Sequence, residues 1–178
     1  MRLRRAIPGL LAACLAVGSA CAQPGGGLPE LGSASNRNET PQQAQGVEVV
    51  ENLGAQLPLE LPFTATDGTT APLATYFDGE KPVVLALVYY DCPIVCTIVM
   101  DKLTAAFKGI DFGIGEDYRV VFASIDPSEP SSLAASVKQR YLLQYERPVA
   151  ERGWGFLTSE SGSTRQLAET LGWNYKPI

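Results

Sequence analysis

The hydrophobic pattern predicts strands and helices in alternation from about Val47 onward. The turn Asp67-Gly68 separates two short β-prone runs and therefore predicts a hairpin. The unbroken apolar run 83–90, "VVLALVYY", predicts a central strand that is buried on both faces. Two further strands are predicted in 118–126 and 154–158, and helices are predicted from Pro93 to Gly109, from Ser131, as its cap, to Tyr145 and from Ser163 to Leu171.

This order of elements is typical of an α/β layer in which right-handed crossovers join parallel strands. The last residues, "WNYKPI", begin another extended segment and then stop. A sheet of this type normally continues beyond such a segment, so we expect the domain to be truncated at its C-terminal end.

The N-terminus has the pattern of an export signal. Three arginines precede an apolar run, Ala6–Ala20, that ends in small residues. The run is shorter than the ~20 apolar residues of a membrane-spanning helix. Cleavage after Ala22 is favoured and predicts an exported, periplasmic protein. The alternative is cleavage before Cys21 at a degraded lipoprotein box, which would anchor the protein to the outer side of the membrane.

Three segments follow from these patterns. Residues 1–22 are predicted to be a signal peptide. Residues 23–46 are rich in Pro, Gly, Ser, Asn and Gln, and they predict a disordered linker because they cannot bury enough apolar surface to fold. Residues 47–178 are predicted to form one domain, which we expect to be monomeric.

Charge and composition exclude some functions. The formal net charge is −5 and there is no basic cluster beyond the N-terminus, which argues against a nucleic-acid partner. The chain contains no histidine. It therefore lacks the common base for a nucleophilic cysteine or serine, and nothing indicates hydrolysis.

The candidate chemistry lies in "DCPIVC", directly after the apolar run 83–90. Cys92 and Cys96 are separated there by three residues. We predict that Pro93 occupies the first helical position, with Cys92 at the N-cap and Cys96 one turn later. The positive potential at a helix N-terminus would then lower the pKa of Cys92. A reactive or metal-binding thiol needs such a shift.

The spacing allows several uses of this pair. Helical residues four apart have Cβ atoms about 5–6 Å apart, whereas a disulfide needs roughly 3.5–4.5 Å, so metal binding requires less adjustment. Two thiolates favour Cu(I) or Zn(II), but structural zinc needs four nitrogen or sulfur ligands. A copper site, a redox pair, a permanent disulfide staple and two buried core cysteines all remain open from the residues alone.

From Leu57 to its end, the chain resembles the Sco/SenC family of exported, thioredoxin-like proteins. The resemblance rests on a strand followed by "DCPIVC", on "VFASIDPSEP", on "KQRYLLQYERP" and on "GWGFLT" before a helix. It implies a thioredoxin-like α/β fold and delivery of copper to the binuclear copper site of cytochrome c oxidase. The implied partner is the copper-site subunit of that oxidase or another copper-receiving protein.

The resemblance also implies roles for individual residues. Cys92 and Cys96 would bind a copper ion and could also cycle to a disulfide, so both are candidate catalytic and metal-binding residues. The family's third ligand is a histidine downstream of "LGWNYKPI", beyond the residues present here. Asp126 matches a family position near the metal, although it is equally suited to cap a turn. Asp91 either tunes the thiols or is solvated at the helix start.

Two functions follow from this sequence. The first is an exported copper metallochaperone that uses the Cys-x-x-x-Cys pair. The alternative is a thiol–disulfide oxidoreductase that reduces the cysteines of a partner protein, and its test is the lability of the disulfide.

Overall fold

The computed structural model describes residues 45–149, 153–159 and 162–175. The chain divides into two units, Met1–Gln43 and Ala44–Ile178, and every described residue belongs to the second. The predicted signal peptide and nearly all of the predicted linker therefore lie outside the described residues. Within the described ranges, no helix has the length and apolar character needed to cross a bilayer.

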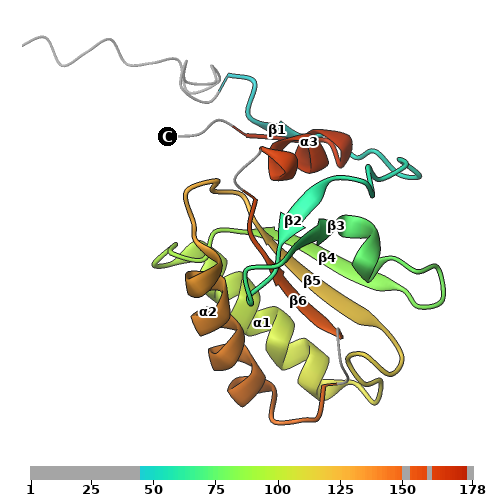
Figure 1. The fold of residues 1–178 in the computed structure, drawn as a ribbon, viewed down its shortest axis with the longest axis vertical. Helices are drawn as coiled ribbons and strands as arrows, with labels where there is room; N and C mark the ends of the chain where they lie inside the picture. The colour runs from blue at the N-terminus through green and yellow to red at the C-terminus, as the bar shows by residue number, and fades with distance from the viewer. Residues whose placement is uncertain (1–44, 150–152, 160–161, 176–178) are drawn as a thin grey trace, which may run out of the picture. The chain divides into compact units, whose positions relative to one another are not determined.

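A three-stranded parallel sheet, in the order β4-β5-β6, forms the centre of the domain (Figure 1). Its strands are β4 (Val83–Val88), β5 (Arg119–Ser124) and β6 (Trp154–Leu157). The register places Val88 opposite Ser124 and Ala123 opposite Leu157, so the carboxyl ends of the strands meet at one edge of the sheet. The predicted parallel arrangement is confirmed.

The position of β4 corrects the prediction of a central strand. Within the described sheet β4 pairs with β5 alone, and of its residues only Val88 is fully buried. Its two faces nevertheless pack against different apolar clusters, with Leu85 and Leu87 on one and Ala86 and Val88 on the other. The unbroken apolar run reflects packing on both faces, which does not require a strand on both edges.

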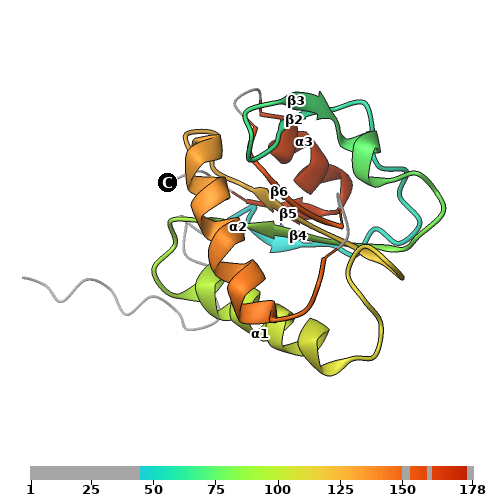
Figure 2. The ribbon, with the colours of Figure 1, turned by 60° about the horizontal axis from the view of Figure 1, so that its bottom comes forward.

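Two helices cover one face of the sheet: α1 (Val95–Gly109) and α2 (Ser131–Tyr145) (Figure 2). The predicted ends of α1 at Gly109 and of α2 at Tyr145 are confirmed, whereas α2 begins at Ser131 itself. Ser131 does not cap α2, because the N-cap is Pro130 and no side chain caps this end. Between the helices and the sheet lies a cluster that we call the aromatic core, made of Phe107, Phe122, Tyr141, Tyr145, Trp154 and Phe156.

The rings of the aromatic core meet mostly edge to face, as aromatic pairs prefer. Phe122 and Phe156 are T-shaped with centroids 5.2 Å apart, and Tyr145 meets Trp154 in the same way at 5.7 Å. Burial of each such side chain stabilises the fold by about 1.5–3 kcal/mol. This packing fixes the positions of α1 and α2 against the sheet. It therefore supports the edge of the sheet at which the carboxyl ends of the strands meet.

The opposite face is covered by β2 (Pro62–Thr64), β3 (Thr70–Pro72), the short 3₁₀ helix η2 (Leu73–Tyr76) and α3 (Ser163–Thr170) (Figure 2). The predicted hairpin turn is confirmed. Gly68 has a positive φ of 83°, and the Asp67 carboxylate accepts the Thr69 N–H at 2.8 Å.

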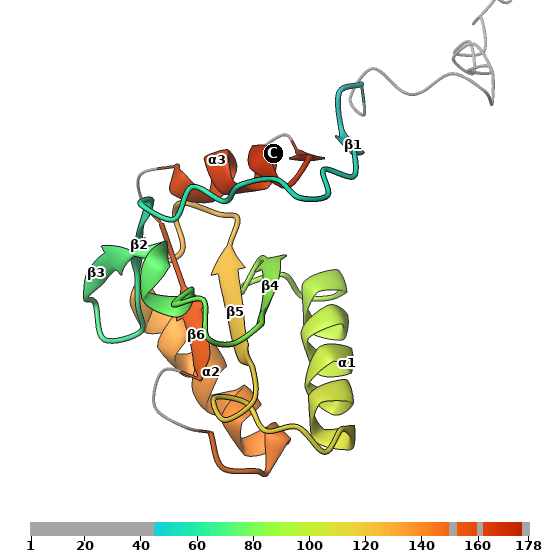
Figure 3. The same ribbon diagram turned by 90° about the vertical axis from the view of Figure 1, so that its right-hand side faces the viewer.

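An additional small sheet pairs β1 (Glu48–Val49) with β7 (Trp173–Asn174). The extended segment that starts at Trp173 was predicted, whereas its pairing with β1 was not. Gly172 makes this approach possible, because a Cβ atom there would lie 1.8 Å from the carbonyl oxygen of Val50. The Val50 N–H donates to the Gly172 carbonyl at 2.8 Å. Figure 3 shows β5 pointing toward the end of the domain where α3 and β7 lie.

Candidate functional site

The connection between β4 and α1 carries the predicted site, and we call residues 89–94 the thiol loop. Its Cys92 N–H donates to the carbonyl of Tyr89 at 3.3 Å, which closes a turn. Ile94, at φ −130° and ψ −73°, is the N-cap, and α1 begins only at Val95. Cys92 therefore lies two residues before the N-cap, which corrects the prediction that Pro93 starts the helix.

Thr97, in the first turn of α1, connects Cys92 to the helix by a hydrogen bond, although Cys92 lies two residues before the N-cap. Its hydroxyl donates to the Cys92 carbonyl at 2.9 Å. The carbonyl thus has a side-chain partner in place of a helical N–H. Cys92 is fixed through both its backbone groups, and Cys96 follows as the second residue of the helix.

The two thiols have opposite electrostatic environments. Hydrogen bonds from the backbone N–H groups of Cys96, Ile94 and Val95 lower the pKa of Cys92. Burial raises the pKa of Cys96, and the neighbouring Cys92 sulfur raises it further. The predicted stabilisation of the Cys92 thiolate by the helix N-terminus is confirmed in direction, since these N–H groups belong to the start of α1.

Both cysteines are free thiols, each partly exposed, and their side chains hydrogen-bond to each other. Over the described ranges, no group of three or more His, Cys, Asp or Glu side chains is arranged to hold a metal ion. Cu(I) can be bound by a small number of soft ligands, whereas a structural zinc ion requires four ligands. Two sulfurs without a third donor therefore suit Cu(I) better than zinc. The donor set therefore fits Cu(I).

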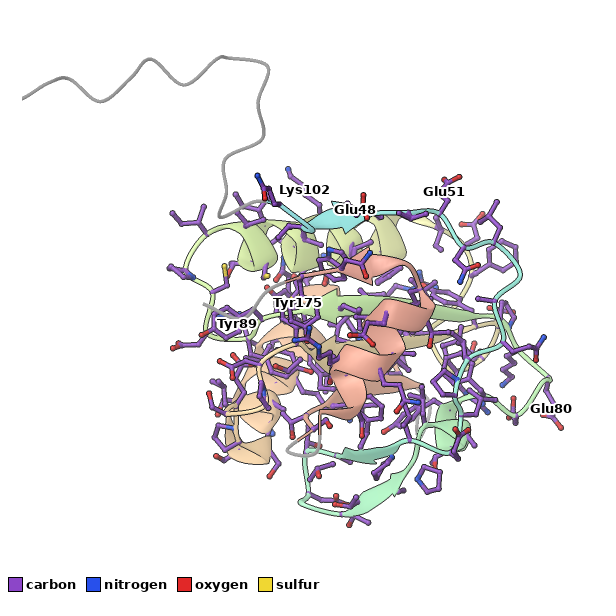
Figure 4. All side chains as sticks on the ribbon, turned by 90° about the horizontal axis from the view of Figure 1, so that it is seen from above. Glu48, Glu51, Glu80, Tyr89, Lys102 and Tyr175 are labelled. Carbon is purple, nitrogen blue, oxygen red and sulfur yellow. The ribbon has the colours of Figure 1, made fainter. Side chains whose placement is uncertain are left out.

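Asp126 lies beside the thiol loop and also caps a turn. Its carboxylate accepts both the N–H and the hydroxyl of Ser128 at 2.7 Å, and these bonds lower the pKa of Asp126. The same carboxylate hydrogen-bonds to the Tyr89 hydroxyl, which raises the pKa of Tyr89. Tyr175, labelled in Figure 4, donates to the neighbouring carbonyl of Ile125 at 3.3 Å.

The side chain of Asp91 is exposed, as expected for a solvated residue before a helix. The backbone of Asp91, in contrast, has a defined partner: its N–H donates to Oε1 of Glu129 at 2.7 Å. Glu129 is only 5% exposed. Sequence reasoning missed this residue, although "SIDPSEP" directly follows a strand at the carboxyl edge, where sites gather in such folds.

Four apolar residues at the start of α1 are exposed to solvent. Ile94 and Val95 are 64% and 65% exposed, and Ile98 and Val99 are also exposed. We call these four residues the apolar rim. Contiguous exposed apolar residues are typical of interaction surfaces.

Part of the chain matches a known protein family. Residues 53–141, half of the chain, match the model of the SCO1/SenC family. No curated protein matches the chain.

Solved structures resemble the domain at low sequence identity. A candidate electron transfer protein from Aquifex aeolicus VF5 has a TM-score of 0.58 and 17% identity, with 70% of this chain and 75% of that chain covered. A copper-bound ScoI from Arabidopsis thaliana has a TM-score of 0.48 and 20% identity, with 64% of this chain and 65% of that chain covered. The predicted α/β, thioredoxin-like fold is confirmed.

Proposed function

Because the chain belongs to the SCO1/SenC family, we propose that it is an exported copper metallochaperone of cytochrome c oxidase assembly. In this proposal Cu(I) is cargo, held between Cys92 and Cys96 and passed to the oxidase copper-site subunit or another copper-receiving protein. The protein works as a monomer in the periplasm or on the outer side of the membrane. Intact mass spectrometry of the exported protein distinguishes cleavage after Ala22 from lipidation at Cys21.

The observation that carries the proposal is a pair of free, partly exposed and mutually contacting thiols, one on the thiol loop and one in the first turn of α1. Binding of Cu(I) requires that both thiols release a proton. The N–H groups at the start of α1 stabilise the Cys92 thiolate, so Cys92 is the first ligand to form. Cys96, which is more buried and held as a thiol, completes the site when the metal charge offsets the cost of its ionisation.

Release to a partner follows from the same geometry. A thiolate of the partner can reach the copper from the exposed side of the loop and displace one sulfur at a time. The apolar rim contains no competing ligand, and it offers a surface on which a partner can bury area during the exchange.

The test is a Cu(I) titration of the chain from Gln23 onward, under reducing conditions and against a competing chelator. We expect one copper per chain for the wild type and none for the variant with both Cys92→Ser and Cys96→Ser. A wild type that binds no copper while both thiols titrate as free would refute the proposal.

The unequal thiols favour one second candidate, a thiol–disulfide oxidoreductase. The Cys92 thiolate would attack a partner disulfide, form a mixed disulfide and release one partner thiolate. Cys96 would then lose its proton and attack the Cys92 sulfur, which releases the second partner thiol and leaves a Cys92–Cys96 disulfide. Two electrons thereby pass to the partner. Equilibration with reduced and oxidised glutathione, together with exchange against a dithiol peptide, tests this function.

A further inference from the structure

The thiol loop is held by a buried carboxylate that belongs to a different element. Glu129 lies in the turn between β5 and α2, and its Oε1 accepts the Asp91 N–H at 2.7 Å. Its Oε2 accepts the Tyr90 N–H at 3.1 Å and also the hydroxyl of Ser124, the last residue of β5. One side chain therefore joins the ends of two neighbouring parallel strands.

Within the part of the chain that the structure describes, this carboxylate pairs with no lysine or arginine. Among the ion pairs of the described residues none includes Glu129, and the side chain is 5% exposed. A buried polar group is costly unless hydrogen bonds satisfy it. Here the donors are two consecutive backbone N–H groups and one hydroxyl, so the bonds that satisfy the buried carboxyl group are also the bonds that fix the loop.

As a consequence, hydrogen bonds fix the backbone on both sides of Cys92. Glu129 holds the backbone of Tyr90 and Asp91, and the next residue is Cys92. Thr97 holds the Cys92 carbonyl from the other side. The loop is thus fixed immediately before and immediately after the residue that supplies the first sulfur.

We infer that Glu129 is a positioning residue that sets the place of Cys92 relative to Cys96 and thereby the affinity of the pair for Cu(I). The inference rests on the proposed function and adds a residue outside the Cys-x-x-x-Cys motif. Groups that orient metal ligands without touching the metal typically contribute 10- to 100-fold to affinity.

The experiment compares Glu129→Gln with wild type in a Cu(I) competition titration. The amide keeps the shape of the side chain, but it replaces one acceptor oxygen with a donor that faces a backbone N–H. We expect Cu(I) affinity to fall about tenfold. Glu60→Gln, at an exposed position, is the matched control and should leave the affinity unchanged.

A separate control excludes a merely structural effect. Val137→Ala removes buried methyl groups of α2 far along the chain from the loop, and it should lower stability without changing Cu(I) affinity. If Glu129→Gln does not fold, Ser124→Ala takes its place, because it removes one of the two donors to Oε2 of Glu129. We then expect a several-fold loss of affinity.

Unchanged affinity in a folded Glu129→Gln protein, or in Ser124→Ala if that variant is used, would overturn the inference. A wild type that binds no copper would instead overturn the proposed function, so the two failures are distinguishable. Amide exchange in the metal-free protein supplies a further check. The Tyr90 and Asp91 amide protons should be protected in wild type, and exchange as fast as in an unstructured peptide would contradict the role of Glu129.

Discussion

The two halves of helix α1 place apolar side chains in opposite environments. In the second half, Phe107 is buried and Leu103 packs against the same apolar cluster. In the first half, which also carries Cys96, Ile98 and Val99 are exposed to solvent. The same residue types thus stabilise the fold at one end and form an open rim at the other. Hydrophobicity alone does not separate core residues from site residues in this helix.

The largest effect is expected on stability, in the aromatic core to which the second half of α1 contributes Phe107. Phe122→Ala removes a ring at the centre of the aromatic core, and we expect it to cost about 3–5 kcal/mol, because a cavity remains. Urea unfolding followed by tryptophan fluorescence measures the loss. A cost below about 1 kcal/mol would mean that the aromatic core does not carry the stability of the domain.

The thiols themselves should differ in their dependence on pH. Backbone N–H donors lower the pKa of Cys92, whereas burial raises the pKa of Cys96. Since the thiolate is the reacting form, alkylation of Cys96 should fade first as the pH falls, and Cys92 should remain reactive to lower pH. Iodoacetamide labelling followed by peptide mass spectrometry reports both rates. Equal midpoints for the two residues would contradict the proposed asymmetry.

Two threonines of α1 allow a matched comparison of its halves. Thr97→Val removes the hydroxyl that holds the Cys92 carbonyl, and we expect a cost of about 1 kcal/mol together with weaker Cu(I) binding. Thr104→Val removes a hydroxyl that donates to the Met100 carbonyl at 2.8 Å in the buried half. Because that carbonyl lies within the helix, Cu(I) affinity should stay unchanged. An equal loss of affinity in both variants would contradict a local role for Thr97.

The smallest effect is expected on the apolar rim. Ile98→Ser should change the stability of the isolated domain by no more than about 0.5 kcal/mol, because the side chain is already exposed. Chemical denaturation supplies the measurement. A loss comparable to that of Phe122→Ala would show that the rim is part of the core.

The sequence pattern predicted those elements whose residues are held by local or strongly periodic packing. The end of α2 at Tyr145, the end of α1 at Gly109 and the turn at Gly68 were predicted correctly. In each case a neighbouring residue or a helical stripe determines the structure. The edge position of β4 was missed because an apolar run reports which faces are covered and not how many strands lie beside it.

The errors at the site have a similar cause. Pro93 is compatible with a helix start, but the turn that Cys92 closes onto Tyr89 delays the helix to Val95. Glu129 was missed because its partners, Tyr90 and Asp91, lie 39 and 38 residues away in sequence. The pairing of β1 with β7 has a still larger separation. Contacts of this range leave no periodic signal.

The most direct test of the central claim, that Cys92 and Cys96 together hold Cu(I), is X-ray absorption spectroscopy of the copper-loaded chain. The account predicts a copper edge typical of Cu(I) and two sulfur neighbours, one of which is lost in Cys92→Ser. A copper ion surrounded by oxygen or nitrogen alone, or a spectrum that Cys92→Ser leaves unchanged, would contradict it.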